Sequence, residues 1–221
     1  MKTSNIIFTV AAAYLLVGMC YNAIRLGALD KNPQDRDPYF GYVVQNVPAK
    51  TSVIILRAES FEGRSVDVRI LRSEHGLFAV EDTSCARILA TDSGLVISLT
   101  RNVPTIYLEL PALSRVKTAD HSRVSIDGFE SDSLTLCVTE EASVSVQRCR
   151  IGTLQVWNDS GNVDFGSSQN DESLNSVGMA DVHLRGGTIS FCHRLDSLRL
   201  DADRASEIHL SGEATRAIGR I

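Results

Sequence analysis

The chain has 221 residues, of which 43% are hydrophobic and only 6% aromatic. Its 22 basic and 27 acidic residues give a formal net charge of −5 at pH 7. Nucleic-acid binding favours a basic stripe with interleaved aromatic side chains, and the basic residues here are scattered, so the composition argues against a nucleic-acid partner. The low aromatic content indicates a thin aliphatic interior rather than a large globular core.

An apolar run from Ile6 to Met19, continuing less purely to Ile24, follows the polar start of the chain. The run is long enough for a helix to cross a hydrocarbon core of about 30 Å. Lys2 favours an amino terminus on the inside with the rest of the chain exported. We therefore expect a transmembrane helix in residues 1–24, acting as a membrane anchor. A cleaved secretory signal is the alternative, although no convincing small-x-small cleavage site follows the run.

Residues 25–49 have a different composition, with Pro33, Pro38 and Pro48 among charged residues. This composition predicts an extended tether that lifts the next domain off the membrane. Runs typical of β-strands then begin at irregular spacing, and we expect them to form opening coils or a small cap over an exposed sheet edge. These runs are Val53–Leu56, Val66–Ile70, Leu77–Val80, Leu95–Leu99 and Ile106–Leu110. No linker follows them, so residues 50–212 are predicted to form one domain and residues 213–221 a tail.

A short alternating pattern recurs about every twenty residues in the second half of the chain. One series starts at Leu134, Leu154 and Leu174, and a second includes Val124, Val144, Val163, Val182 and Ile208. Short strands at a fixed period predict a solenoid in which each repeat stacks on the next. The predicted fold is therefore all-β, a right-handed parallel β-helix with coils of about twenty residues. An antiparallel sandwich is the alternative, but sandwiches do not repeat their spacing so closely.

The passage from Leu108 to Val124 resembles the opening of the autotransporter adhesin head GIN domain family. Small-residue turns that each lead into a strand extend the resemblance over residues 50–212; they lie at Ala119–Ser122, Ala142–Ser143, Ser160–Gly161, Met179–Ala180 and Ala205–Ser206. The resemblance implies an exported β-helical domain, often membrane-attached and associated with adhesion. The family's Ser-Gly turn pair survives only at Ser160–Gly161 and Ser211–Gly212. The other corners must therefore do without glycine's freedom at positive φ.

Carboxylates gather at the predicted corners and outward positions, where they could bind a cation or perturb one another's pKa. The candidates are Glu140, Glu141, Asp159, Asp164, Asp181, Asp201 and Asp203. Polar corners are also where a solenoid keeps its solvated charge, so no catalytic residue is assigned. Among the histidines, His121 falls in a corner, and His183 and His209 are expected at equivalent outward positions, facing solvent rather than sharing a metal.

The cysteines beyond Cys20 do not predict a disulfide framework. The repeat places Cys137 beside Trp157, and no pair falls within the Cα separation of about 7 Å that a disulfide needs. No Cys-x-x-Cys spacing predicts a zinc site. We expect free, partly buried thiols at Cys85, Cys137, Cys149 and Cys192.

Three functional hypotheses follow from the sequence. The first, which we favour, is a non-catalytic, membrane-tethered module of the cell envelope that recognises a glycan or a surface protein through its outward strand faces, without a cofactor or nucleic acid. The second is a structural scaffold that polymerises end to end, which requires apolar, uncapped terminal coils. The third is a small carbohydrate-active enzyme, which requires a groove with converging carboxylates. The sequence assigns no binding residue and leaves homo-oligomers open.

Overall fold

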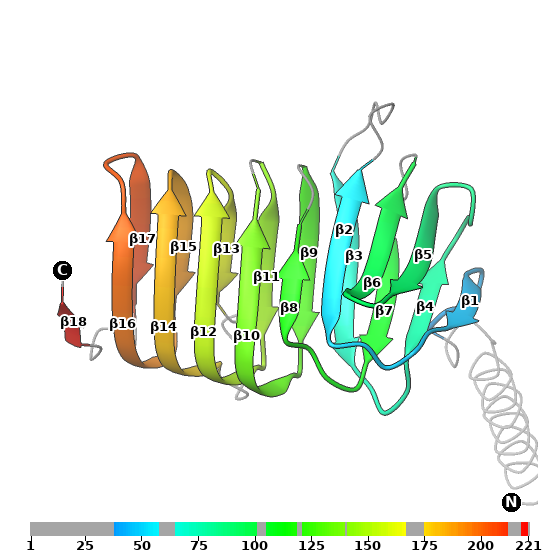
Figure 1. Ribbon diagram of the computed structural model, residues 1–221, viewed down its shortest axis with the longest axis horizontal. Helices are drawn as coiled ribbons and strands as arrows, with labels where there is room; N and C mark the ends of the chain where they lie inside the picture. Colours follow the sequence, from blue (N-terminus) through cyan, green and yellow to red (C-terminus); the bar gives the residue numbers. More distant parts are fainter. Residues whose placement is uncertain are drawn as a thin grey trace, which may run out of the picture. The chain divides into compact units, whose positions relative to one another are not determined.

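The computed structural model describes residues 38–57, 65–100, 105–118, 121–139, 141–166, 175–211 and 218–220. The predicted anchor in residues 1–24 lies outside the described residues. Within the described part, no helix has the length and apolar character needed to cross a membrane. Residues from Tyr42 onward form one compact unit. Its described residues build two nine-stranded sheets, so the predicted all-β class is confirmed (Figure 1).

The strand order of each sheet differs from the order of the strands in the chain. The first sheet, sheet A, contains in spatial order β1 (Val43–Asn46), β4 (Leu77–Val80), β7 (Thr105–Leu110), β3 (Val66–Arg72), β9 (Ser122–Asp127), β11 (Ser143–Gln147), β13 (Asn162–Phe165), β15 (Gly187–Phe191) and β17 (Ser206–Leu210). The second, sheet B, contains β18 (Ile218–Arg220), β16 (Arg194–Ala202), β14 (Ser176–Arg185), β12 (Arg150–Asp159), β10 (Glu130–Val138), β8 (Arg115–Lys117), β2 (Ser52–Arg57), β6 (Gly94–Leu99) and β5 (Ala86–Thr91).

From β8 to β17 the chain alternates between the two sheets, and each strand pairs in parallel with its neighbours. We call one strand of sheet B and the following strand of sheet A a layer, as in β10 with β11. Period-two alternation turns one set of side chains into the space between the sheets, as Val144 and Val146 of β11 show. A layer cannot bury this apolar face alone, so stacking on the next layer is what makes it stable. The layers follow one another from green to orange in Figure 1.

The predicted twenty-residue period holds between the first layers and fails later. Leu134 pairs with Leu154, as expected, but Leu154 pairs with Ala180. The predicted series that continues at Leu174 is therefore wrong, and Leu174 itself lies outside the described residues. The connection between β13 and β14 is longer than the one between β11 and β12. The next strand of sheet B therefore starts later in the chain, and this delay leaves its pairing with β12 unchanged.

The same delay shifts the second predicted series. Val163 pairs with Ile189 of β15, and Ile189 pairs with Ile208 of β17. Val182 belongs to β14 of sheet B, so its predicted place in the second series is wrong. Hydrogen-bonded register, rather than residue count, sets which side chains stack.

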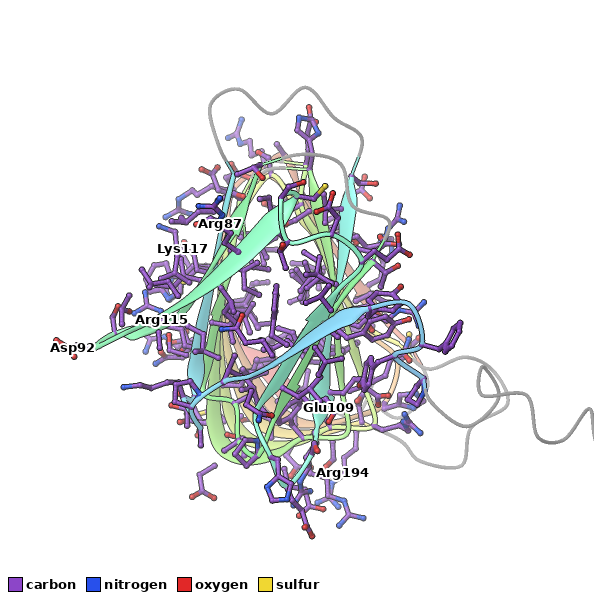
Figure 2. The ribbon with its side chains drawn as sticks, turned by 90° about the vertical axis from the view of Figure 1, so that its right-hand side faces the viewer. Arg87, Asp92, Glu109, Arg115, Lys117 and Arg194 are labelled. Atoms are coloured by element: carbon purple, nitrogen blue, oxygen red, sulfur yellow. The ribbon has the colours of Figure 1, made fainter. Side chains whose placement is uncertain are left out.

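Antiparallel strands cover one end of the stack. The layer of β6 and β7 pairs in parallel with β2 and β3, whose other side carries β8 and β9. Beyond β6 and β7, the antiparallel strands β5 and β4 add one strand to each sheet, and β1 pairs with β4. The range predicted as a tether is 25–49, and its described part, residues 38–49, contains the strand β1. Figure 2 looks onto this end, with Arg87, Arg115 and Lys117 on the outside of sheet B.

The interior is a set of apolar columns with two buried asparagines. Val124, Val144, Val163 and Ile189 stack in one column and are each at most 2% exposed. Burying each such side chain contributes roughly 1.5–3 kcal/mol. The rings of Phe165 and Phe191 also stack, with centroids 5.0 Å apart. The described interior is mostly aliphatic, as the low aromatic content predicts, and it also holds the buried rings of Phe78 and Phe129.

Candidate functional site

An aromatic pair stands on the outer face of sheet B. Trp157 of β12 and His183 of β14 are Cα partners, and their rings stack with centroids 4.0 Å apart and planes 7° from parallel. Alternation sends both outward, because the flanking Val156 and Val182 point inward. Trp157 remains 52% exposed although His183 lies against one of its faces. It is the single tryptophan of the chain.

The strand register extends this pair into a row of outward side chains. Across sheet B, Lys117, Cys137, Trp157, His183 and Asp201 are successive Cα partners. The predicted proximity of Cys137 to Trp157 is confirmed. The short side chain of Cys137 is the next one in the row on the side of Trp157 that points away from His183.

A pocket of about 290 Å³ opens beside the two rings. Its lining is mainly apolar, with polar groups at the ends of the strands; it comprises Cys137, Val138, Thr139, Trp157, Asn158, Asp159, His183 and Arg185. Asn158 is only 2% exposed, and its side-chain amide donates to the Gly161 carbonyl oxygen at 2.9 Å, so it belongs to the frame of the pocket. The exposed groups that reach a ligand are therefore the rings and the polar side chains around them.

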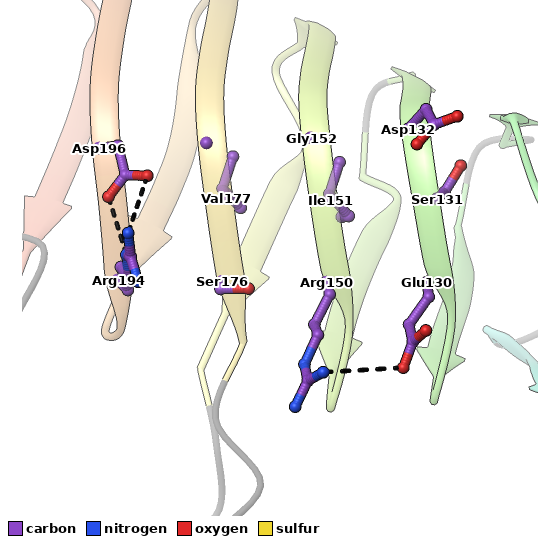
Figure 3. A pocket seen from close by; sticks show the side chains of 11 residues that line it. Glu130, Ser131, Asp132, Arg150, Ile151, Gly152, Ser176, Val177, Arg194 and Asp196 are labelled. Atoms are coloured by element: carbon purple, nitrogen blue, oxygen red, sulfur yellow. Dashed lines mark hydrogen bonds and ion pairs between the residues drawn. The ribbon is translucent and has the colours of Figure 1, made fainter.

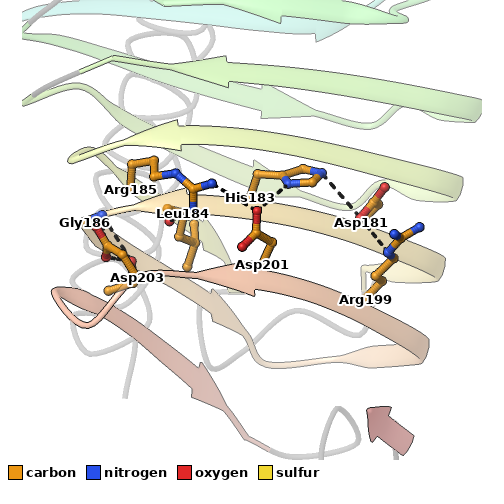
Figure 4. Close-up of polar contacts among 9 residues, drawn as sticks. Asp181, His183, Leu184, Arg185, Gly186, Arg199, Asp201 and Asp203 are labelled. Carbon is orange, nitrogen blue, oxygen red and sulfur yellow. Dashed lines mark hydrogen bonds and ion pairs between the residues drawn. The ribbon is translucent and has the colours of Figure 1, made fainter. Parts of the chain in front are cut away.

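Two carboxylates hold His183 on its outer side (Figure 4). The Asp201 Oδ2 atom lies 3.3 Å from Nδ1, and the Asp181 Oδ1 atom lies 3.6 Å from Nε2. Arg185 donates from Nη2 to Asp201 at 3.1 Å. The hydrogen bonds from Arg185 and His183 hold the pKa of the Asp201 carboxyl below its usual value. These contacts hold the imidazole in the position in which it stacks on the indole ring of Trp157.

The structure brings together only some of the carboxylates singled out in the sequence. Asp159, Asp181 and Asp201 lie around the aromatic pair, on three adjacent strands of sheet B. Asp164 lies on sheet A, where it accepts a hydrogen bond from the Ser190 hydroxyl. Asp203 caps a corner by accepting from the Gly186 amide nitrogen at 3.0 Å.

The remaining candidates lie apart from this site. Glu141 forms an ion pair with His121, linking two successive corners, while Glu140 lies outside the described residues. His209 belongs to β17 of sheet A and pairs with Ser190, so its predicted equivalence to His183 is wrong. The delay between β13 and β14 is again the reason. No group of three metal-ligating side chains occurs in the described part of the chain.

A second, larger hollow of about 530 Å³ lies near the beginnings of β10, β12, β14 and β16 (Figure 3). Two ion pairs lie in it, Arg194 with Asp196 at 2.8 Å and Arg150 with Glu130 at 4.0 Å. Gly152 and Gly178 line it because their strands need glycine there. A Cβ on Gly152 would lie 2.8 Å from the Asp132 carbonyl oxygen, and one on Gly178 would lie 2.7 Å from the carbonyl of Gly152. The hollow is a consequence of this close backbone approach, and no aromatic ring lines it.

The aromatic pair is therefore the stronger candidate site. Sequence reasoning placed Trp157 beside Cys137 but assigned it no role. The sequence did contain a signal for a binding role. A lone tryptophan at an outward position of an alternating strand exposes more apolar surface than the fold requires. The pairing of Trp157 with His183 could not be predicted, because the longer connection between β13 and β14 changes which residue of β14 lies next to Trp157.

Comparison with solved structures shows what fold the chain shares. It is similar to a "putative adhesin" from Parabacteroides merdae, with 12% identity, 76% of this chain and 75% of that chain covered, and a TM-score of 0.56. A "putative adhesin" from Bacteroides fragilis aligns over 80% of this chain and 94% of its own, with 12% identity and a TM-score of 0.45. No family model and no curated protein matches the sequence. The first likeness supports a shared fold, and the resemblance to the head GIN domain family stays a prediction.

Proposed function

We propose that this protein is a non-catalytic binding domain of the cell envelope, exported and tethered to the membrane by its N-terminal segment, with a role in adhesion. Its stacked parallel layers would form a right-handed β-solenoid that presents the outer face of sheet B. The observation that carries the proposal is the exposed Trp157, stacked on His183 beside an open pocket. Exposed aromatic surface next to a concave site is typical of ligand recognition. The fold shared with a protein named as an adhesin is consistent with this role.

A binding role fits the carboxylates of the site better than catalysis does. Glycoside hydrolysis requires one carboxylic acid with a raised pKa to protonate the leaving group. The pKa of Asp201 is instead lowered by Arg185 and His183. Asp201 is therefore suited to fixing the position of its neighbours rather than to donating a proton.

The experiment that tests the proposal measures binding of the full chain to whole bacterial and host cell surfaces and to envelope extracts. Heat-unfolded protein is the control for adhesion through exposed apolar segments. Saturable binding by the folded chain, without release of a product from the bound surface, is the expected result. Product release would favour the enzyme instead, and filaments growing from the purified chain in place of binding would favour the scaffold.

A further inference from the structure

We infer that the pocket beside Trp157 takes a neutral pyranose ring, one sugar unit of a surface glycan. The inference rests on the proposed binding function and names the ligand class for its site. The first argument is the shape of the aromatic surface. His183 covers one face of the indole, and the opposite face looks along the row toward the short Cys137 side chain. A flat ring can therefore add to the stack on that side and continue the arrangement of two parallel rings.

The second argument is the distribution of polar groups around the apolar floor. Thr139, Asp159 and Arg185 line the pocket with a hydroxyl, a carboxylate and a guanidinium. The Asp159 carboxylate has no hydrogen bond or ion pair among the described residues, so it can accept from a ligand. A pyranose has an apolar face of C–H groups and a periphery of hydroxyls that donate and accept. An apolar floor with a few placed polar groups at its edge matches both parts of such a ring.

The third argument separates a neutral sugar from other ring-bearing ligands. The pocket lining holds one carboxylate, on Asp159, and one guanidinium, on Arg185, so these charges balance and give an anionic sugar or a nucleotide no net attraction. An aromatic side chain of a protein partner would stack equally well on Trp157. It would, however, leave the Asp159 carboxylate desolvated without a hydrogen-bond donor, which is costly.

Intrinsic fluorescence gives a direct test, because Trp157 is the single tryptophan and its emission reports on this site alone. The full chain is titrated with lactose and cellobiose as neutral sugars, with digalacturonic acid as an anionic sugar, and with the amide of Phe-Phe as an aromatic peptide. We expect a saturable change in emission with at least one neutral disaccharide and a weaker or absent response to the other two probes. A response to Phe-Phe amide alone, or to no neutral sugar, overturns the inference.

Variants then locate the binding, with calorimetry as the readout where the tryptophan is removed. Trp157→Ala should weaken neutral-sugar binding about tenfold or more, since it removes the stacking surface. Asp159→Asn keeps the shape of the site and should weaken it by a smaller factor. Ser176→Tyr, which partly fills the hollow at Gly152 and Gly178, is the matched control and should bind as the unmodified chain does.

The outcomes distinguish this inference from the proposed function. If the full chain binds a cell surface and Trp157→Ala binds it equally well, the sugar site is wrong and the binding function stands. If the folded chain binds no surface at all, the proposed function fails first. Circular dichroism of each variant, compared with the unmodified chain, shows that any loss of binding comes from the site and not from unfolding.

Discussion

Corner residues of successive layers adopt a left-handed backbone whether or not they are glycine. The φ angles before β9, β11, β13 and β15 are 55° at His121, 56° at Glu141, 62° at Ser160 and 82° at Gly186. A side chain costs roughly 1–2 kcal/mol in this region. Stacked corners repeat one backbone path, so the hydrogen bonds between layers impose the conformation even where the sequence lacks glycine.

Two glycines separate the effect of positive φ from that of close packing. Gly128 and Gly187 have φ of 80° and 76°. A Cβ on Gly128 would have Arg72 Cβ as its nearest neighbour, at 3.7 Å, whereas one on Gly187 would overlap the carbonyl oxygen of Gly161. Gly128→Ala should therefore lower the free energy of unfolding by about 1–2 kcal/mol. Gly187→Ala should lower it by about 3 kcal/mol or more, because strain and overlap add. Urea unfolding measures both, and equal losses would contradict the register of β13 and β15.

Burial makes Cys149 unreactive. Its side chain is fully buried, and burial raises the pKa of the thiol to about 11. The thiolate is the reactive form, so almost none is present at pH 8. In the folded chain, iodoacetamide at pH 8 should modify the partly exposed Cys85 and Cys137 well before Cys149. Peptide mass spectrometry reads the order, and urea-unfolded protein, in which all these thiols react, is the control. Early modification of Cys149 would show that its layer opens readily.

The ion-pair cluster beside the site should make a pH-dependent contribution to stability. Hydrogen bonds from Arg185 and His183 lower the pKa of Asp201 in the folded state. A carboxyl whose pKa is lowered in the folded state contributes stability at pH values above its unfolded pKa of about 3.9. This contribution is lost as the pH falls through the folded-state pKa. Asp201→Asn should therefore lower the Tm at pH 6–7, with the difference from the unmodified chain closing in acid.

The control for that experiment is Asp92→Asn, at the tip of the β5–β6 hairpin (Figure 2). The Asp92 carboxylate makes no ion pair among the described residues, so its replacement should leave the Tm unchanged at both ends of the pH range. A Tm difference for Asp201→Asn that persists below pH 3 would show that packing, and not charge, is responsible.

At the scale of the strand, a buried asparagine pairs backbone groups that the hydrogen bonds between strands leave without a partner. Asn175, just before β14, is 3% exposed. Its Oδ1 atom accepts from the Cys149 amide nitrogen at 2.8 Å, and its Nδ2 group donates to the Val146 carbonyl oxygen at 2.7 Å. These bonds tie the start of β14 to β11 and to the corner between β11 and β12.

Removing the side-chain amide of Asn175 should lower the free energy of unfolding. Asn175→Ala would leave the Cys149 amide nitrogen and the Val146 carbonyl oxygen buried without this partner, each at about 1–3 kcal/mol. We expect a loss of about 2–4 kcal/mol in the free energy of unfolding. Asn162→Ala, at an exposed position of β13, is the matched control and should change stability by less than about 0.5 kcal/mol. A neutral Asn175→Ala would mean that the connection is held by other contacts.

The elements that the sequence predicts well are those whose signal is local. The alternation of Val144 and Val146 is visible within one strand and predicts burial correctly. The pairing of Leu154 with Ala180 is not, because it depends on the length of an intervening connection that periodicity treats as constant. The site depends on that pairing: Trp157 is apparent as an outward residue, while His183 becomes its neighbour only through the register.

At the scale of the whole stack, stability should vary from layer to layer. Strands β10, β12 and β14 have a neighbour on both sides and alternate buried side chains along their length. Strand β17, at the end of sheet A, has no fully buried residue, and Leu210 is 38% exposed. In structures of stacked repeats, each layer is stabilised mainly by its neighbours.

Native-state hydrogen exchange checks this expectation. Amides of β12 and β14 should exchange slowest, and those of β17 fastest among the strands from β9 to β17. The comparison is internal to one sample, since all strands share pH and temperature. Uniform protection from β9 to β17 would instead indicate a single cooperative unit with no weak end.

The two ends of the stack differ, which bears on the scaffold hypothesis. Antiparallel β4 and β5 follow the parallel strands at one end, and exposed side chains such as Val43 and Val44 on β1 lie beyond them. End-to-end growth by continued parallel pairing would require a partner edge that matches β1 and β5. Covering an edge with short or antiparallel strands is a common way to prevent such pairing.

The position of β2 and β3 within the stack has a consequence for how the protein is made. Among the described layers, this one leaves the ribosome before the others, yet β6 and β7 later pair on one side of it and β8 and β9 on the other. During synthesis the nascent chain therefore grows outward from an internal seed in both directions. The cap is finished before the aromatic site is translated, so the parallel edge exposed to other nascent chains is the one at which Trp157 and His183 are added.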